Sequence, residues 1–310
     1  MSSGSDGGSP PAAPSVSVII PTHDRADFVS EAIASVLAQE HAAGEVVVVD
    51  DNSGDHTQEV LSEFGNAVRV LRSETNIERG AARNLGARRA DGEMLAFLDS
   101  DDIWEPQKLA RQLDAVGDRA PSVTGIRFID RRGQSFGRPY LPHTASEQEL
   151  PIYNYCLASP STMLVPKTAF EDVGGFPEER VYQGSEDWIF LVQLLWQGWP
   201  IRVVREPLVG YRVHPDSGTQ RPENLERSMW AACRWIDEQS TGPPRLAANR
   251  HSRAAAAIGC AYVAGGRWRR GGRWARRALS EGSPGIRIHA AWRLLRTAVR
   301  WLTARPRPRS

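Results

Sequence analysis

Residues 93–106, EMLAFLDSDDIWEP, place a dense group of acids directly after a short apolar run. The run from Met94 to Leu98 has the length and composition of a buried strand. Asp99, Asp101 and Asp102 follow it within four positions. The question that this stretch raises is what stabilises so much negative charge at the end of a buried strand.

The residues before this stretch alternate between predicted strands and predicted helices. VSVII at 16–20, EVVVV at 45–49 and the run 68–71 predict strands, and 28–39, 56–64 and 79–90 predict helices. Fully apolar strands that alternate with helices indicate an α/β fold with a mostly parallel, Rossmann-like sheet and helices on both faces. Such sheets bind ligands at the carboxyl ends of their strands.

A second acidic pair, Asp50 and Asp51, follows the strand at 45–49. We expect it to share one crevice with Asp99 and Asp101. Two carboxylates in a D-x-D pattern suit a hard divalent cation such as Mg²⁺ or Mn²⁺, which would neutralise a diphosphate. A solvated acidic turn explains the same three letters, since short patterns occur by chance.

Beyond Trp104 the pattern is looser. It predicts helices at about 106–116 and 186–197, strands at 124–129, 161–166 and 201–204, and an irregular region at 131–159. From about Pro222 the chain is Ala-, Arg- and Trp-rich, with a helix pair expected at 250–264 and 268–279.

Charge is unevenly distributed, although the formal net charge is only +1. Residues 221–310 hold 19 arginines and five acids, whereas the first 220 residues hold 19 basic and 32 acidic side chains. This asymmetry predicts two parts, an α/β domain at 15–220 and an Arg-rich helical appendage at 221–310. Residues 1–14, MSSGSDGGSPPAAP, have no apolar core and predict a disordered leader. Three scattered cysteines without CxxC spacing favour a reducing cytoplasm.

The appendage ends in a basic amphipathic segment, with apolar residues at helical spacing and arginines on another face: Ile288, Trp292, Leu295, Val299 and Leu302 against Arg293, Arg296 and Arg300. Such a helix suits peripheral contact with the inner face of an anionic membrane. It equally suits docking on the acidic domain or on a partner. Nucleic acid is not expected as a partner, because no recognised binding fold accompanies the charge.

Several motifs, taken together and in order, resemble those of glycosyltransferase family 2. They are VSVIIPTHDR, VVVVDDNSGD, NIERGAARNLGARRADGEMLAFLDSDD, GGFPE, SEDWIFLVQLLWQG and YRVHPDS, and they span about residues 15–217. The resemblance implies a GT-A fold and a nucleotide-sugar donor, with a UDP-sugar favoured. It also implies a carbohydrate, lipid-linked or small-molecule acceptor, as in the synthesis of cell-envelope polysaccharides.

The same resemblance assigns the donor site. The loop after the first strand and the acid after the second would hold the nucleoside, through Pro21, Thr22, Asp24 and Asp51. A carboxylate can accept a hydrogen bond from a base N–H, which agrees with this role for Asp51. Arg79 and Arg83 would lie near the diphosphate or base, and for Arg83 a structural ion pair is an equal alternative.

The metal assignment follows the family's D-x-D pattern. Asp101 would bind the cation directly, Asp99 would support the ribose or the cation through water, and Asp102 would lie behind them. His214 matches a histidine that some members place on the metal or diphosphate, and an imidazole ligand would favour Mn²⁺ over Mg²⁺.

The catalytic assignment falls on Glu186 and Asp187. At the start of a helix these acids are also favoured by the helix dipole alone. In the family the second acid of this pair is the general base, so Asp187 would deprotonate an acceptor hydroxyl in an inverting displacement. Glu186 and Trp188 would contact donor or acceptor, although a tryptophan here is as often part of the core.

Two other functions remain to be weighed. A noncatalytic GT-A-like module would bind nucleotide or glycan and recruit partners through the helical tail; the intact D-x-D, Glu186-Asp187 pair and His214 argue against it. A sugar nucleotidyltransferase would need a Gly-rich loop after the first strand, and PTHDRAD has no glycine. The main hypothesis is therefore an inverting, metal-dependent glycosyltransferase, with acceptor specificity in 131–159 and the tail.

Overall fold

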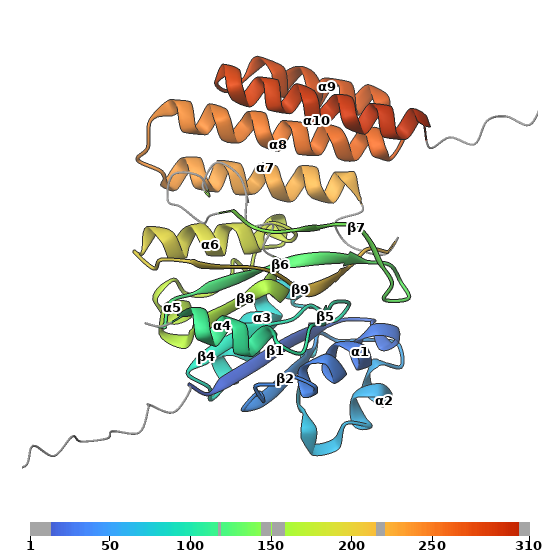
Figure 1. Cartoon of the computed structure of the whole chain (residues 1–310), viewed down its shortest axis with the longest axis vertical. Helices are drawn as coiled ribbons and strands as arrows, with labels where there is room; N and C mark the ends of the chain where they lie inside the picture. Colours follow the sequence, from blue (N-terminus) through green and yellow to red (C-terminus); the bar gives the residue numbers. More distant parts are fainter. Residues whose placement is uncertain (1–13, 117–118, 144–149, 151–158, 215–220, 304–310) are drawn as a thin grey trace, which may run out of the picture.

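A computed structural model describes residues 14–116, 119–143, 150, 159–214 and 221–303, with side chains up to residue 299 (Figure 1). The predicted leader, apart from Pro14, and much of the irregular region at 131–159 lie outside these residues. Within the described ranges, no helix has both the length and the apolar character that crossing a membrane requires.

Among the residues that the structure describes, nine strands form one central sheet. The strands are β1 (Val16–Thr22), β2 (Glu45–Asp50), β3 (Arg69–Arg72), β4 (Met94–Phe97), β5 (Ile103–Trp104), β6 (Ser122–Ile129), β7 (Ser135–Tyr140), β8 (Met163–Pro166) and β9 (Arg202–Arg212). Their order is β3-β2-β1-β4-β8-β6-β9-β5, with β7 paired to β6.

The sheet has a parallel half and a mixed half. β3, β2, β1 and β4 are parallel neighbours. β8 then joins β4 and β6 in antiparallel orientation, while β6 and β9 are parallel. The predicted α/β class is confirmed, and the parallel half is the part that brings strand ends to one edge.

Helices cover both faces of the sheet (Figure 1). They are α1 (Ala26–Leu37), α2 (Thr57–Ser62), α3 (Glu78–Arg89), α4 (Lys108–Val116), α5 (Lys167–Asp172) and α6 (Glu186–Trp196), with 3-10 turns η1 (Gly65–Ala67), η2 (Pro160–Thr162) and η3 (Arg180–Tyr182). In β1, Val18 and Ile20 pack with α1, whereas Ile19 faces the cluster that contains α6. This alternation explains why the strand is apolar throughout.

Four further helices form the predicted C-terminal appendage, stacked on the α6 side of the sheet (Figure 1). They are α7 (Pro222–Gln239), α8 (Pro244–Ala264), α9 (Trp268–Ser280) and α10 (Pro284–Thr303). Cys233 and Ile236 of α7 belong to the same buried cluster as α6, and Trp196 stacks on Trp235 at 5.9 Å. The core is therefore continuous across residue 221, and the domain boundary there stays a prediction.

Three elements were not expected from the sequence: β5, β7 and α5. β9 is also longer than the strand predicted at 201–204, because Arg205, Glu206 and Pro207 interrupt its apolar pattern. The register with β6 shifts at this point, from Val204 opposite Thr124 to Pro207 opposite Gly125. A bulge tolerates a proline that a regular ladder would exclude, so pairing in the sheet overrides the local signal.

Candidate active site

A cavity of about 180 Å³, which we call the strand-end cavity, opens at the carboxyl ends of β1, β2 and β4. It confirms the expectation that the two acidic clusters face one crevice, since Asp51, Asp99 and Asp101 all line it. The full lining is Pro21, Thr22, His23, Arg25, Asp51, Asn76, Glu78, Arg79, Ala82, Arg83, Asp99, Ser100 and Asp101.

The backbone around this cavity adopts left-handed conformations at residues that are not glycine. Asp24, Asn52 and Glu78 have φ values of 49°, 60° and 70°. Each lies in a loop or helix start at the edge where β1 and β2 end. Such conformations cost free energy and persist where surrounding contacts enforce them, which is common at binding sites.

Asp51 ties two of these loops together. Its Oδ1 accepts a hydrogen bond from the Ile77 amide at 2.7 Å, and its Oδ2 accepts one from the Glu78 amide at 2.9 Å. Each carboxylate oxygen can accept a further bond, so this does not exclude a ligand. The buried Thr22 hydroxyl also lines the cavity and has no hydrogen-bond partner among the described residues. A buried hydroxyl without a partner is costly, which favours a ligand here.

Asp24 differs from the other residues predicted to contact the nucleoside. It does not line the strand-end cavity, and its Oδ1 accepts a hydrogen bond from the Gly54 amide at 2.8 Å. It thus joins the loop after β1 to the loop after β2. The neighbouring His23 and Arg25 do line the cavity, and neither was predicted as a site residue from the sequence. Their position in the loop after the first strand could have indicated them.

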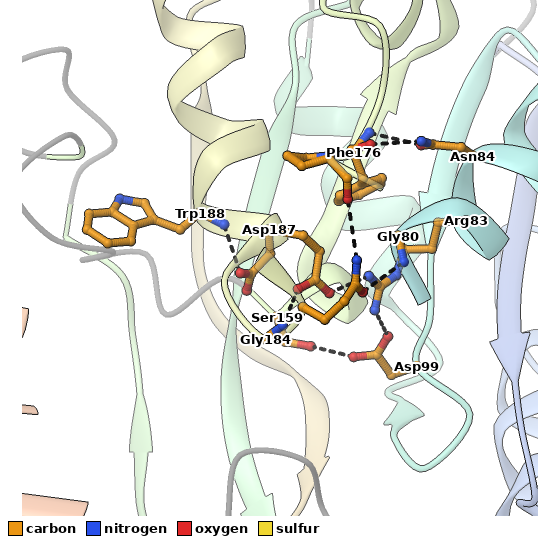
Figure 2. Close-up of polar contacts among 12 residues, drawn as sticks. Gly80, Arg83, Asn84, Asp99, Ser159, Phe176, Gly184, Asp187 and Trp188 are labelled. Carbon is orange, nitrogen blue, oxygen red and sulfur yellow. Dashed lines mark hydrogen bonds and ion pairs between the residues drawn. The ribbon is translucent and has the colours of Figure 1, made fainter. Parts of the chain in front are cut away.

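Arg83 joins the two predicted acidic motifs. It is 1% exposed, and its Nη2 lies 2.5 Å from Asp99 Oδ1 while its Nη1 lies 2.8 Å from Glu186 Oε1. Figure 2 shows the contact with Asp99. Burial disfavours the charge, but the two carboxylates hold the arginine pKa above its ordinary value. The structural ion pair weighed for Arg83 is therefore present, and Arg83 also lines the cavity wall.

Asp101 and His214 are brought together from distant parts of the chain. His214 Nε2 lies 3.0 Å from Asp101 Oδ2. Burial opposes ionisation of Asp101, but the hydrogen bond to His214 and the charge of Arg25 hold its pKa below the ordinary value. Asp101 is therefore suited to act as an anionic ligand at neutral pH.

This pair fits part of a cation site. Adjacent ligands of an octahedral cation, each bound at about 2.1 Å, lie about 3 Å apart, which matches the separation of the two side chains. Among the described residues, no group of three His, Cys, Asp or Glu side chains could hold a metal. The other ligands would have to be phosphate oxygens or water, as is usual for cations bound with nucleotides.

Asp102 has a different environment from its two neighbours. It is 1% exposed and accepts hydrogen bonds from the Ser161 hydroxyl at 2.6 Å and the Arg212 amide at 2.9 Å. Burial and the charges of Asp101 and Asp99 raise its pKa well above the ordinary value. Asp102 therefore connects the acidic loop to η2 and β9, and it does not line the strand-end cavity.

A second cavity of about 270 Å³, which we call the helix-end cavity, lies at the start of α6. It shares Arg79, Arg83 and Asp99 with the strand-end cavity. The rest of its lining is Ile126, Phe128, Ser159, Pro160, Gly184, Ser185, Glu186, Asp187, Trp188, Tyr211 and Met229. The two cavities are therefore adjacent.

Asp187 lines the helix-end cavity and is half-buried. Its Oδ1 accepts a hydrogen bond from the Trp188 amide at 2.8 Å (Figure 2). Burial and the neighbouring charge of Glu186 raise its pKa to about 8. A carboxylate that binds protons near neutral pH is suited to general-base chemistry.

Glu186 and Trp188, on either side of Asp187, have structural partners. Burial disfavours the charge of Glu186, yet Arg83 and Arg79 hold its pKa below the ordinary value. Trp188 is 2% exposed, and its Nε1 donates to the Leu150 carbonyl at 2.7 Å. In Figure 2 the ring points away from Arg83. Trp188 is therefore packed in the core, which was the alternative to ligand contact. It also borders the helix-end cavity.

The sequence model of glycosyl transferase family 2 matches residues 17–174, just over half of the chain. The chain belongs to this family. It is therefore a glycosyltransferase, and the matched segment contains β1 to β4 and the D-x-D loop.

Two curated relatives agree with this assignment. The putative teichuronic acid biosynthesis glycosyltransferase TuaG of Bacillus subtilis is 29% identical over 72% of this chain and 89% of its own. The glucosyltransferase WfgD of Escherichia coli is 39% identical over 33% of this chain and 40% of its own.

Two solved structures share the fold. S. aureus TarS 1-349, in complex with UDP-GlcNAc, has a TM-score of 0.61 at 17% identity and covers 94% of this chain and 91% of its own. The Pyrobaculum calidifontis mannosyltransferase PcManGT, in complex with GDP-Man and Mn²⁺, also has a TM-score of 0.61 at 17% identity. The match covers 96% of this chain and 89% of that one. Both matches extend over the helical appendage, and the predicted GT-A fold is confirmed.

Proposed function

We propose that this glycosyltransferase moves one sugar from a nucleotide-diphosphate donor to a hydroxyl acceptor by a single inverting displacement, with Asp187 as the general base. The observation that carries the proposal is the position of Asp187. Its carboxyl has a pKa raised to about 8 and lines a cavity that shares Arg79, Arg83 and Asp99 with the strand-end cavity. A base beside the donor pocket is the arrangement that direct displacement requires.

The reaction needs one proton acceptor and no covalent intermediate. The acceptor oxygen forms a bond to the anomeric carbon while its proton passes to the Asp187 carboxylate. The bond from that carbon to the diphosphate oxygen breaks, and its electron pair leaves with the diphosphate. Attack opposite the leaving group inverts the configuration. Because Asp187 binds a proton more tightly than an ordinary aspartate, it is the stronger base once ionised.

Donor binding is proposed at the strand-end cavity. Pro21, Thr22 and Asp51 would hold the nucleoside, and Arg79, which has no ion-pair partner among the described residues, would face the diphosphate. Asp24 would act by fixing the loop. A UDP-sugar is the favoured donor, in keeping with the UDP-GlcNAc bound by TarS. A GDP-sugar is the alternative donor, since PcManGT binds GDP-Man.

A divalent cation, Mn²⁺ or Mg²⁺, is proposed to bind between Asp101 and His214 together with the donor diphosphate. Their 3.0 Å separation supports this. When bound, such a cation would stabilise the negative charge of the departing diphosphate. Mn²⁺, which PcManGT binds, accepts an imidazole ligand more readily than Mg²⁺ does.

The experiment that tests the proposal compares Asp187→Asn with wild type. Release of UDP from UDP-sugars with Mn²⁺ is measured with and without acceptor mixtures. The asparagine keeps the shape but cannot take the proton, so turnover should fall about 10²- to 10⁴-fold. Asp114→Asn, an exposed carboxylate on α4, is the matched control and should retain activity. Full turnover by Asp187→Asn would refute the base assignment. Nucleotide binding without any turnover in wild type would favour the noncatalytic module.

The acceptor is proposed to be a carbohydrate, free or lipid-linked, in the assembly of cell-envelope polysaccharide. The names of two relatives support this class: TuaG is assigned to teichuronic acid biosynthesis, and WfgD acts on GlcNAc-diphosphoundecaprenol. Screening uronate-containing and lipid-diphosphate acceptors against each UDP-sugar would separate the two kinds of acceptor.

Peripheral contact with the membrane is proposed through α10. Ile288, Trp292, Leu295 and Val299 on this helix are 61%, 61%, 55% and 49% exposed. This face is not docked on the α/β domain within the described residues, while Ala290 packs inside the appendage. An exposed apolar stripe beside arginines suits an anionic lipid surface. Sedimentation with phosphatidylglycerol vesicles should fall on Trp292→Ser with Leu295→Ser, and unchanged sedimentation would refute the contact.

A further inference from the structure

The appendage contains a cavity of about 530 Å³, larger than either cavity of the active site. We call it the appendage cavity. It lies between α7, α8 and α9, and none of its residues takes part in the transfer described above. Its lining is Glu223, Glu226, Arg227, Tyr262, Arg270, Arg273, Trp274 and Arg277.

The appendage cavity keeps uncompensated positive charge. Both of its acids already have partners: Glu223 pairs with Arg267 and with Arg270, and Glu226 accepts a hydrogen bond from the Tyr262 hydroxyl. Arg273 has no hydrogen bond or ion pair to another described residue, and Arg227 has only a contact of 3.5 Å to the Asn224 side chain. Two arginines are therefore available to bind an anion.

Aromatic side chains line the same cavity. Trp274 is half-buried, and the Arg277 guanidinium lies 5.9 Å from its ring centre. Arg277 also forms an ion pair with Glu281 at 2.9 Å. We therefore assign Arg277 a structural role in the cavity wall and not a role in binding a ligand. A tryptophan face offers apolar area to a sugar ring, and arginines bind carboxylate or phosphate oxygens. The combination matches a carbohydrate that carries oxyanions.

The appendage cavity and the helix-end cavity share a neighbouring cavity. A cavity of about 230 Å³ lies between them, lined by Glu78, Arg79, Gln183, Gly184, Asn224, Leu225, Arg227 and Ser228. It shares Arg227 with the appendage cavity and Arg79 and Gly184 with the helix-end cavity. The three cavities are therefore neighbours, and adjacent cavities lie between Arg273 and the proposed base.

We propose that the appendage cavity binds an oxyanion-bearing segment of the acceptor glycan, at a distance from the hydroxyl that receives the sugar. This inference rests on the proposed function, because it places the reacting hydroxyl at Asp187. Carboxylates of uronic acids and phosphodiesters of a sugar-phosphate or polyol-phosphate chain share the chemistry that Arg227 and Arg273 recognise. The exposed stripe of α10 lies on a different helix and is not part of this site.

The test measures binding of a fluorescent hexauronate to the full-length protein by anisotropy. Competitors are an oligomeric glycerol phosphate, a neutral hexasaccharide and a single-stranded DNA oligonucleotide. Arg227→Ala with Arg273→Ala should weaken hexauronate binding at least about tenfold, since two charge-assisted contacts are lost. Arg234→Ala with Arg276→Ala removes two exposed arginines of α7 and α9 outside the cavity and should leave affinity unchanged.

The competitors decide the ligand class. The relative strength of competition by unlabelled hexauronate and by the glycerol phosphate oligomer identifies the preferred oxyanion. Equal competition by the neutral hexasaccharide, better competition by DNA, or equal loss in the control variant would overturn the proposal. UDP binding with Mn²⁺ by the wild-type protein is measured in parallel. Its absence would count against the proposed donor site, whereas hexauronate binding bears only on the appendage.

Discussion

Arginines serve opposite purposes in the two halves of this molecule. Arg83 is 1% exposed and forms ion pairs with both Asp99 and Glu186. Its charge therefore links the D-x-D loop to the start of α6. Arg227 and Arg273 of the appendage are exposed and have no carboxylate partner among the described residues. The difference teaches that burial with paired acids makes an arginine part of the architecture, whereas exposure leaves it available to a ligand.

The largest expected effect comes from breaking the buried pair. Arg83→Met leaves the carboxylates of Asp99 and Glu186 without their partner, and it should lower the free energy of unfolding by about 3–5 kcal/mol. Donor turnover should be lost with it. Arg88→Met, on the same helix, removes an exposed pair with Glu178 at 3.4 Å and should cost no more than about 1 kcal/mol. Urea denaturation measures the free energy of unfolding of both variants. Equal losses of stability would contradict the structural role of Arg83.

A smaller effect is expected at the metal pair. His214→Gln should weaken Mn²⁺ binding in the presence of UDP by about 10- to 100-fold, because one cation ligand is lost. Calorimetric titration measures the affinity. His56→Gln, an exposed histidine before α2, is the control. If His214→Gln binds Mn²⁺ as wild type does, His214 supports Asp101 only by its hydrogen bond.

The raised pKa of Asp187 predicts a pH dependence of stability. The unfolded chain releases this proton near pH 4, and the folded chain holds it until about pH 8. Wild type should therefore lose stability as pH rises from about 4 to 8, and Asp187→Asn should lose less, because Asp102, whose pKa is also raised, still titrates in the variant. At pH 8 we expect the variant to be more stable by about 1–2 kcal/mol. Thermal unfolding across this range measures it, and parallel curves for the two proteins would contradict the assignment.

The same group should control turnover. Since only ionised Asp187 can accept the proton, kcat/KM of wild type should rise with pH up to about 8. A rate that is constant between pH 6 and 8, with the Mn²⁺ concentration held fixed, would show that another group is the base.

The smallest effect is expected for the exposed arginines. Arg273→Ala should change the free energy of unfolding by no more than about 0.5 kcal/mol, although it weakens hexauronate binding. Urea denaturation checks the first quantity and anisotropy the second. A large loss of stability would mean that Arg273 has a structural role, and the contrast with Arg83 would fail.

Much of the parallel half could be predicted from the sequence, because its strands are short apolar runs separated by helical patterns. The prediction that the acids after β2 and β4 line one cavity is also correct, because both strands end at the same edge of the sheet. β7 and β9 were missed or shortened because exposed or interrupted strands carry little apolar signal. The side chain of Asp24 could not be placed, since nothing local indicates that it binds the Gly54 amide 30 positions later.

The sequence by itself determined the α/β class, the family and the edge of the sheet where Asp51, Asp99 and Asp101 meet. Hydrophobic periodicity and the alternation of strands and helices along the chain are local properties, and parallel strands of one sheet bring their carboxyl ends to the same edge. Only the tertiary structure decided that Arg83 spans 103 positions to reach Glu186, that Asp187 acquires a raised pKa, and that α7, α8 and α9 enclose a cationic cavity. These depend on which elements pack against one another, and burial then sets the charge of each group.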